Sequence, residues 1–151
     1  MKLAEALQER ADLNRNIEQL QRRLNNNVLV QEGEEPAEDP QKLKEMLDES
    51  IARLAYLIKC INQTNCQTII DGKSLTELIA QKDALSLKIH AYKDIVYTAS
   101  QSVYRARNTE IKIKQTINVA SWQAEIDQMA KNLRLLDNKL QENNWQTDLI
   151  E

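Results

Sequence analysis

The segment between Val28 and Pro40 carries five carboxylates and no basic side chain. Carboxylate oxygens are the ligands that hard cations such as Ca²⁺ prefer, so a metal site is one interpretation of this stretch. The candidate ligands are Glu32, Glu34, Glu35, Glu38 and Asp39. Their spacing does not follow the regular ligand pattern of an EF-hand loop. We therefore favour a solvated connection between two helices, and we expect no cofactor or bound metal.

A second group of polar residues lies in the stretch "INQTNCQTIIDGKSLTE", residues 61–77. One interpretation is a polar pocket that binds a ligand, lined by Asn62, Thr64, Asn65, Asp71 and Glu110. The other is a corner, because Asn and Thr side chains bond locally to backbone groups left unpaired at a helix end. Gly72 tolerates the positive φ of a turn, and Ser74 with Glu77 forms a capping box for a following helix. We favour the corner.

Other chemistry finds less support in this stretch. A phosphate-binding P-loop needs glycine five residues before Gly72, and Gln67 stands there. Cys60 and Cys66 are accompanied by one histidine in the whole chain, so a Cys/His zinc site within one subunit cannot be completed. No nucleophile lies in a recognisable elbow, and no histidine–carboxylate pair is suggested. We therefore favour a protein without catalytic residues.

A basic segment follows later in the chain, interrupted by Glu110 alone. Its members are Arg105, Arg107, Lys112 and Lys114. Opposite charges arranged on two surfaces steer those surfaces together. We expect these cations to contact the acidic stretch, either within one subunit or between subunits.

Composition and periodicity predict the elements that hold these residues. The 151-residue chain has two glycines, two prolines and no phenylalanine, a profile typical of long helices. Apolar residues recur at heptad spacing along most of it. We predict one mainly α-helical domain, residues 1–151, with four long helices in antiparallel coiled-coil-like hairpins or a bundle. The predicted elements are helix 2–27, acidic loop 28–39, helix 40–62, corner 62–74, helix 75–105, strand 109–117 and helix 119–143.

The strand at 109–117 is predicted because Ile111, Ile113 and Ile117 alternate with lysines, which is the period of a strand. A strand needs a partner, and Thr68–Ile70 is the other β-like cluster. We expect these two segments to pair in a small ribbon.

Location and partners follow from charge and hydropathy. The net charge of −3 gives no general attraction to nucleic acid or to an anionic membrane. No apolar run approaches the roughly 20 residues of a membrane-spanning helix, and no signal peptide is evident. We expect a cytoplasmic protein with reduced cysteines.

Several blocks resemble one family from end to end, including "VQEGEEPAEDP", "INQTN", "DGKSLTELIAQKDAL" and "LDNKLQENNWQTDL". They are similar to the septicolysin-like family of small bacterial proteins. The resemblance implies a helical homo-oligomer, with a dimer-based hexamer as one such assembly, and no activity that can be assigned to particular residues. The family label suggests a cytolysin, although no segment suited to lipid is visible.

Surplus apolar positions point the same way as that resemblance. They are Ile51, Ile58, Ile79 and Leu87, and a thin helical bundle cannot cover all of them internally. We therefore expect a homo-oligomer with a structural or protein-interaction role. The alternatives are a ligand- or metal-binding oligomer with a polar pocket near the corner, and a cytolysin.

Overall fold

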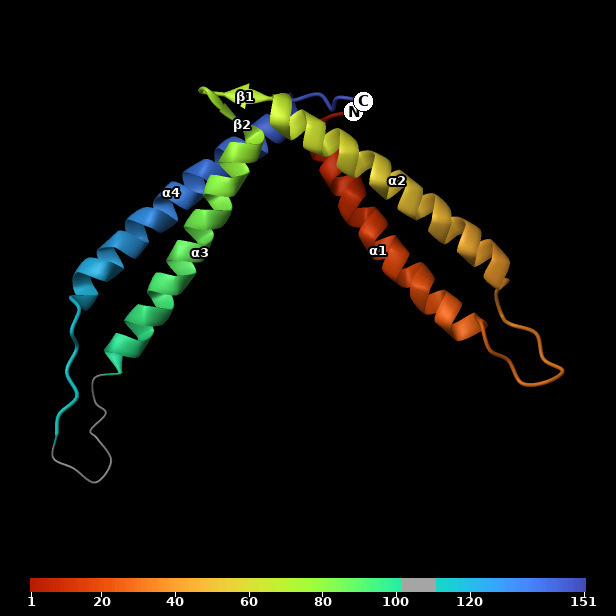
Figure 1. Ribbon diagram of the computed structural model, residues 1–151, viewed down its shortest axis with the longest axis horizontal. Helices are drawn as coiled ribbons and strands as arrows, with labels where there is room; N and C mark the ends of the chain where they lie inside the picture. Colours follow the sequence, from red (N-terminus) through yellow and green to blue (C-terminus); the bar gives the residue numbers. More distant parts are fainter. Residues whose placement is uncertain (102–110) are drawn as a thin grey trace. The chain divides into compact units, whose positions relative to one another are not determined.

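The described part of the chain forms four helices and one small β-hairpin, and Figure 1 shows them in chain order. The computed structural model describes residues 1–101 and 111–151. Its elements are α1 (Leu3–Asn27), α2 (Pro40–Gln67), β1 (Ile69–Ile70), β2 (Lys73–Ser74), α3 (Leu75–Ser100) and α4 (Val119–Gln146). The predicted mainly α-helical class is confirmed.

Part of the sequence-based prediction lies outside the described residues. This part comprises the end of the helix expected over 75–105, the first residues of the strand expected over 109–117, and Arg105, Arg107 and Glu110.

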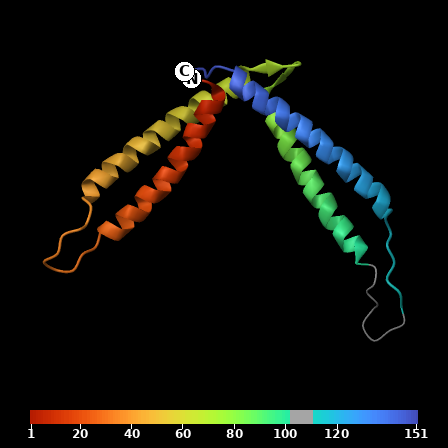
Figure 2. The same cartoon turned by 180° about the vertical axis from the view of Figure 1, so that it is seen from behind.

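The described chain divides into two compact units, Met1–Ser74 with Glu142–Glu151, and Leu75–Gln141. The first unit contains α1 and α2, which we call the first hairpin. The second contains α3 and most of α4, which we call the second hairpin. Figures 1 and 2 view the chain from opposite sides, and in both the two helices of each hairpin lie side by side. The expected single domain stays a prediction.

The first unit has a well-buried apolar core. The side chains of Leu3, Ala6 and Leu20 in α1 are fully buried, as are Leu57 and Cys60 in α2. The Cα atoms of α1 and α2 come within 8 Å of each other at many positions. Small buried residues such as Ala6 permit that close approach, because little side-chain volume separates the backbones there.

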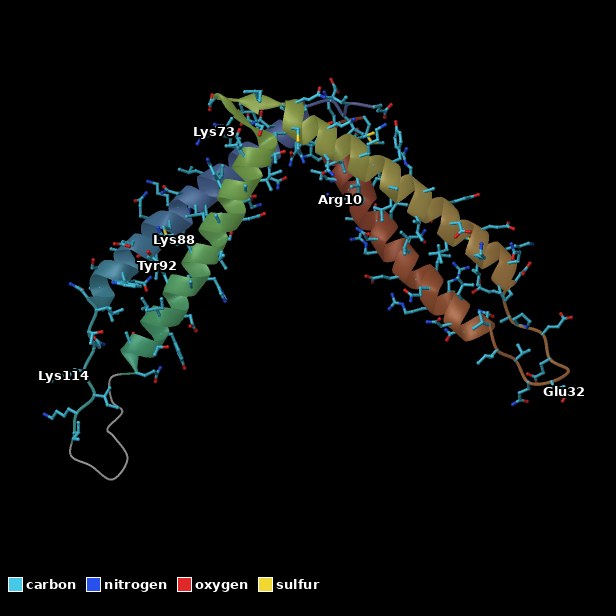
Figure 3. All side chains as sticks on the ribbon, in the orientation of Figure 1. Arg10, Glu32, Lys73, Lys88, Tyr92 and Lys114 are labelled. Atoms are coloured by element: carbon cyan, nitrogen blue, oxygen red, sulfur yellow. The ribbon has the colours of Figure 1, made fainter. Side chains whose placement is uncertain are left out.

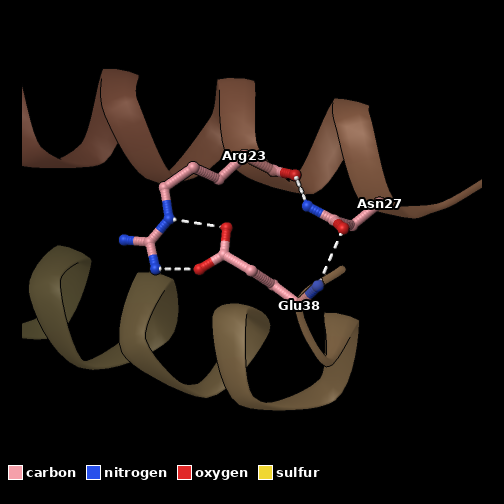
Figure 4. A network of polar contacts seen from close by, with 3 residues as sticks. All are labelled: Arg23, Asn27 and Glu38. Carbon is pink, nitrogen blue, oxygen red and sulfur yellow. Dashed lines mark hydrogen bonds and ion pairs between the residues drawn. The ribbon is translucent and has the colours of Figure 1, made fainter. Parts of the chain in front are cut away.

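A polar network closes the first hairpin where its two helices are joined (Figure 4). The amide of Asn27, a buried side chain at the end of α1, donates to the Arg23 carbonyl at 2.8 Å. Its oxygen accepts from the Glu38 backbone N–H at 2.9 Å. The Arg23 guanidinium holds the Glu38 carboxylate through two N–H donors. The loop therefore returns to α1 before α2 begins.

The start of α2 follows the predicted capping pattern. The Asp39 carboxylate accepts from the Gln41 backbone N–H at 2.9 Å, and Pro40 occupies the first helical position. Proline fits there because its missing N–H would have no intrahelical partner in any case.

The end of α2 corrects the prediction. The helix continues to Gln67, five residues beyond the expected end at 62, so the corner comprises only residues 68–74. No glycine or proline interrupts this stretch. The Thr64 hydroxyl donates to the Cys60 carbonyl four residues earlier, at 2.8 Å. We expected local side-chain bonds of this kind to mark the end of the helix, but Thr64 makes its bond within α2.

The predicted two-stranded ribbon is present, but its predicted pairing is wrong. Ile69 pairs with Ser74 and Ile70 with Lys73 in antiparallel register, instead of Thr68–Ile70 with 109–117. Asp71 and Gly72 have φ values of 50° and 81°. Positive φ at both central residues marks a two-residue type I′ turn, whose twist suits adjoining strands. The local partner is favoured because closing a two-residue loop costs little entropy.

The second hairpin has a core of its own. Ile89 and Val96 of α3 and Ile126 of α4 are buried there. Larger side chains pack around them and stay partly exposed, namely Leu85, Tyr92, Val119, Trp122, Met129 and Leu133. The Tyr92 and Trp122 ring centroids lie 5.0 Å apart. The Cα atoms of α3 and α4 come within 8 Å at hardly any described position. Bulky side chains thus hold these two helices further apart.

Both helices of the second hairpin begin where the sequence predicted. The helix α3 starts at Leu75, directly after β2, and α4 starts at Val119. The Asn118 side chain accepts from the Ser121 backbone N–H at 3.0 Å, as an N-cap does. The end of α4 lies at Gln146, three residues beyond the predicted end at 143.

The last residues of the chain complete the first unit. Leu3 N–H donates to the Thr147 carbonyl and Leu149 N–H to the Met1 carbonyl, both at 2.9 Å. The buried Thr64 hydroxyl accepts from the Ile150 N–H at 2.9 Å. Segments at opposite ends of the sequence therefore share one core.

Candidate interaction surfaces

The acidic loop, residues 28–39, does not use its carboxylates alike. Glu32, Glu34 and Glu35 are exposed, and Figure 3 shows Glu32 at the outer end of the loop. Glu38 is half-buried and paired with Arg23, whose hydrogen bonds lower the pKa of that carboxyl from its ordinary value. In the part of the chain that the structure describes, no three His, Cys, Asp or Glu side chains are grouped to hold a metal ion.

The residues considered for a polar pocket occupy different environments. Asn62 is exposed on α2, whereas Thr64 is fully buried with both its hydrogen bonds made. Positions 62 and 64 are two residues apart, so their side chains point about 200° apart around the helix and do not share a face. Asn65 is half-buried on α2, Asp71 lies in the β-hairpin turn, and Glu110 is outside the described residues. A ligand pocket here stays a prediction.

The basic segment is described only in part. Lys112 and Lys114 are exposed, and Figure 3 marks Lys114 in the stretch before α4. Residues 111–117 form no strand, although Lys112 takes part in an isolated β-bridge. The expected contact between this segment and the acidic loop stays a prediction. The thiols are free, with Cys60 buried and Cys66 exposed.

Exposed apolar side chains on α2 form a stripe. Ile51 is 47% exposed and Ile58 is 41% exposed. Seven residues separate them, so their directions around the helix differ by only about 20°. The exposed Ala55 lies between them on the same side. We call Ile51, Ala55 and Ile58 the α2 stripe.

The other two surplus apolar residues identified from the sequence differ in how exposed they are. Leu87 on α3 is 71% exposed, whereas Ile79 is half-buried. No described helix is long and apolar enough to cross a membrane.

A groove between α3 and α4 was not foreseen from the sequence. It encloses about 350 Å³. Its lining residues are Lys82, Ile89 and Lys93 from α3, and Ala130, Leu133, Arg134 and Asp137 from α4. On each helix these positions recur at the spacing of one face, which a search for amphipathic positions can find. Which face meets which depends on the register between the helices, and the sequence does not show that register.

The charges in this groove, which we call the basic groove, are unbalanced. Lys82 pairs with Asp137 at 2.5 Å, and this hydrogen bond lowers the pKa of Asp137 from its ordinary value. Lys93 and Arg134 have no ion-pair partner among the described residues. Three cations and one carboxylate thus surround an apolar floor made by Ile89 and Leu133, so the groove attracts anions.

A second hollow of about 380 Å³ lies where α3 ends. Its apolar lining includes Ile95, Ile113 and Ile117. It carries one carboxylate, Asp94, and one cation, Lys114, so its charges balance.

Known proteins resemble this chain in both sequence and fold. Residues 10–149 match a family described as a family of unknown function (DUF6847). Over 99% of each chain, the structure is similar to the crystal structure of a functionally unknown conserved protein from Corynebacterium diphtheriae, with 34% identity and a TM-score of 0.92. No curated protein matches. Nothing in these matches supports the septicolysin-like resemblance, on which the cytolysin alternative depends.

Proposed function

The chain belongs to this family of unknown function, and from that premise we propose that it is a helical interaction protein that associates with its own copies through the α2 stripe. The observation that carries the proposal is the exposure of Ile51 and Ile58 on one side of α2. Large apolar side chains grouped on a surface are a mark of protein–protein contact sites.

A second copy is the partner that the stripe fits best. Apolar residues seven apart form the seam of two packed helices, because each seam residue fits between residues of the facing helix. In a twofold contact the same patch meets itself, so one stripe supplies both sides. Such a contact needs no other chain.

The surroundings of the stripe support that arrangement. Lys44 and Asp48 lie on the same side of α2 and form an ion pair of 2.8 Å. Asn62 follows at the other end and is exposed. An apolar centre with a polar, charge-balanced rim is typical of an interface between soluble subunits.

The test replaces both isoleucines by lysine. In Ile51→Lys/Ile58→Lys, repulsion between the added charges and the lost apolar contact prevent two stripes from meeting. We expect the wild-type protein to sediment at a multiple of 17.5 kDa at micromolar concentration, and the variant at a lower mass than wild type.

The matched control places the same two charges elsewhere on α2. Ala52→Lys/Gln63→Lys alters exposed residues that lie more than about 80° from the centre of the stripe. This control is expected to keep the wild-type mass, and circular dichroism should show all three proteins equally helical. A wild-type protein of one chain mass would refute the proposal.

A further inference from the structure

The acidic loop carries exposed apolar residues that its own hairpin leaves uncovered. Leu29 is 87% exposed, and its neighbours Val28 and Val30 are also exposed. Glu32, Glu34 and Glu35 follow directly, with no ion-pair partner among the described residues. The segment thus offers an apolar anchor followed by three negative charges. That combination is suited to a surface with an apolar floor and a positive border.

The basic groove is a surface of that kind. Ile89 and Leu133 form its apolar floor, and Lys93 and Arg134 supply the charges that lack a partner in the described chain. We infer that the acidic loop of one copy docks into the basic groove of a second copy. Leu29 lies against the floor, and the glutamates that follow it face Lys93 and Arg134.

The dimensions of the two surfaces agree. Along α3, the groove extends from Lys82 to Lys93, eleven residues or about 16 Å of helix. The loop from Leu29 to Glu34 spans up to about 17 Å when extended. An anchored Leu29 therefore leaves its glutamates within the length of the groove.

The other hollow fits the loop less well. It has one cation and one carboxylate, so it does not favour a strongly acidic segment. The basic groove has an excess of two positive charges, and the three free glutamates of the loop complement them. Charge complementarity thus selects one of the two hollows.

This contact goes beyond the proposed function, because it uses residues distant from the α2 stripe. It joins two different surfaces, whereas the stripe meets itself. Either contact can exist without the other, so each can be tested separately.

The first experiment exchanges the charges and mixes the products. The loop-reversed chain carries Glu32→Lys, Glu34→Lys and Glu35→Lys, and the groove-reversed chain carries Lys93→Glu and Arg134→Glu. Each alone is expected to associate on the order of tenfold more weakly than wild type, since its like charges now face one another. In the mixture each loop meets a groove of opposite charge, so the wild-type mass should return.

Both reversed chains are studied with and without Ile51→Lys/Ile58→Lys, which removes the stripe contact. Restored mass in that background supports the loop–groove contact even where the stripe proposal has failed. Reversing two exposed cations outside the groove, Lys42→Glu/Lys131→Glu, is the control and should leave the mass unchanged. If mixing the reversed chains gives no larger species than either alone, the inference is wrong.

The second experiment maps the contact directly and does not depend on the stability of the reversed chains. A photo-crosslinking amino acid replaces Leu29 in isotope-labelled chains, which are mixed with unlabelled wild-type chains. We expect crosslinks between labelled and unlabelled chains at peptides containing Ile89 or Leu133. Crosslinks confined to one chain, crosslinks between chains at other peptides, or the absence of any crosslink would overturn the inference.

Discussion

The two hairpins of this protein are built from helices of similar length but are packed differently. In the first, fully buried residues such as Ala6 and Cys60 accompany a close approach of α1 and α2. In the second, Tyr92, Trp122 and Met129 keep α3 and α4 further apart and stay partly exposed. A small residue in the core gives a tighter hairpin, and a large one leaves room for a groove beside it. The first hairpin therefore has a tight apolar core, and the second has a looser core with a groove beside it.

Truncating a matched pair of leucines tests this comparison most strongly. Leu20 in α1 is fully buried, whereas Leu133 in α4 is half-buried at the basic groove. Leu20→Ala should lower the free energy of unfolding by about 2–5 kcal/mol, because it leaves a cavity. Leu133→Ala should cost less than half as much. Urea unfolding followed by circular dichroism measures both, and equal losses would remove the distinction between the hairpins.

Removing the buried amide tests how the first hairpin is closed. Asn27→Ala leaves the Glu38 N–H without its acceptor, at a cost of about 1–3 kcal/mol. Hydrogen exchange at the Glu38 amide should become faster. The neighbouring exposed Asn26→Ala is the control and should change neither quantity. Unchanged exchange at Glu38 in Asn27→Ala would mean that the network does not hold the loop.

The β-hairpin that follows α2 depends on its turn. Gly72 has φ of 81°, and a Cβ there would meet no atom within 4 Å, so substitution strains only the backbone. Gly72→Val should therefore cost about 1–2 kcal/mol, the penalty of a left-handed conformation for a residue with a Cβ. Thermal unfolding measures this loss. Gly72→Asn is the matched control, because asparagine tolerates this region, and it should lose clearly less stability.

Acid should affect stability least, and it should act mainly through the first hairpin. Hydrogen bonds from Arg53 lower the pKa of Glu9, and those from Arg23 lower the pKa of Glu38. Because the folded state lowers both pKa values, the stabilisation is present at pH values above the ordinary carboxyl pKa. It is lost as the pH falls through the lowered values, where the folded state must take up protons.

Urea midpoints between pH 7 and pH 3 measure that effect. Arg53→Met/Arg23→Met should flatten the acid limb of the curve, because both carboxyls then return toward their ordinary pKa. The single change Arg22→Met removes an exposed cation without a described ion-pair partner and should leave the curve as it is. An unaltered acid limb in the double variant would assign the loss to other groups.

The parts of the fold that the sequence predicted rest on local chemistry. Asp39 with Pro40 marks the start of α2, and the residues around Ser74 mark the start of α3. Such signals act over one helical turn, so they can be read without knowledge of the tertiary structure. The end of α2 was missed because Asn and Thr were given their usual preference for helix ends. In the folded chain, Thr64 bonds both within α2 and to Ile150.

The surfaces were less predictable than the helices. Heptad spacing identified Ile51 and Ile58 as surplus apolar positions, and both are exposed. The basic groove was missed, because Lys93 and Arg134 are 41 residues apart and meet only through the packing of α3 against α4. Similarly, the acidic loop was identified by its charge, but nothing in its sequence showed that Glu38 would pair with Arg23 while Glu32 remained exposed.

The first unit is discontinuous in sequence, since Met1–Ser74 is completed by Glu142–Glu151. During synthesis the buried Thr64 hydroxyl cannot accept its hydrogen bond from Ile150 until that residue, 86 positions later, has been made. Making the intervening segment takes several seconds at about 5–20 residues per second. The second hairpin lies within one continuous stretch, Leu75–Gln141, and needs no segment so distant in sequence. The nascent first unit, with its core incomplete over that interval, is therefore the part of the chain most in need of chaperone protection.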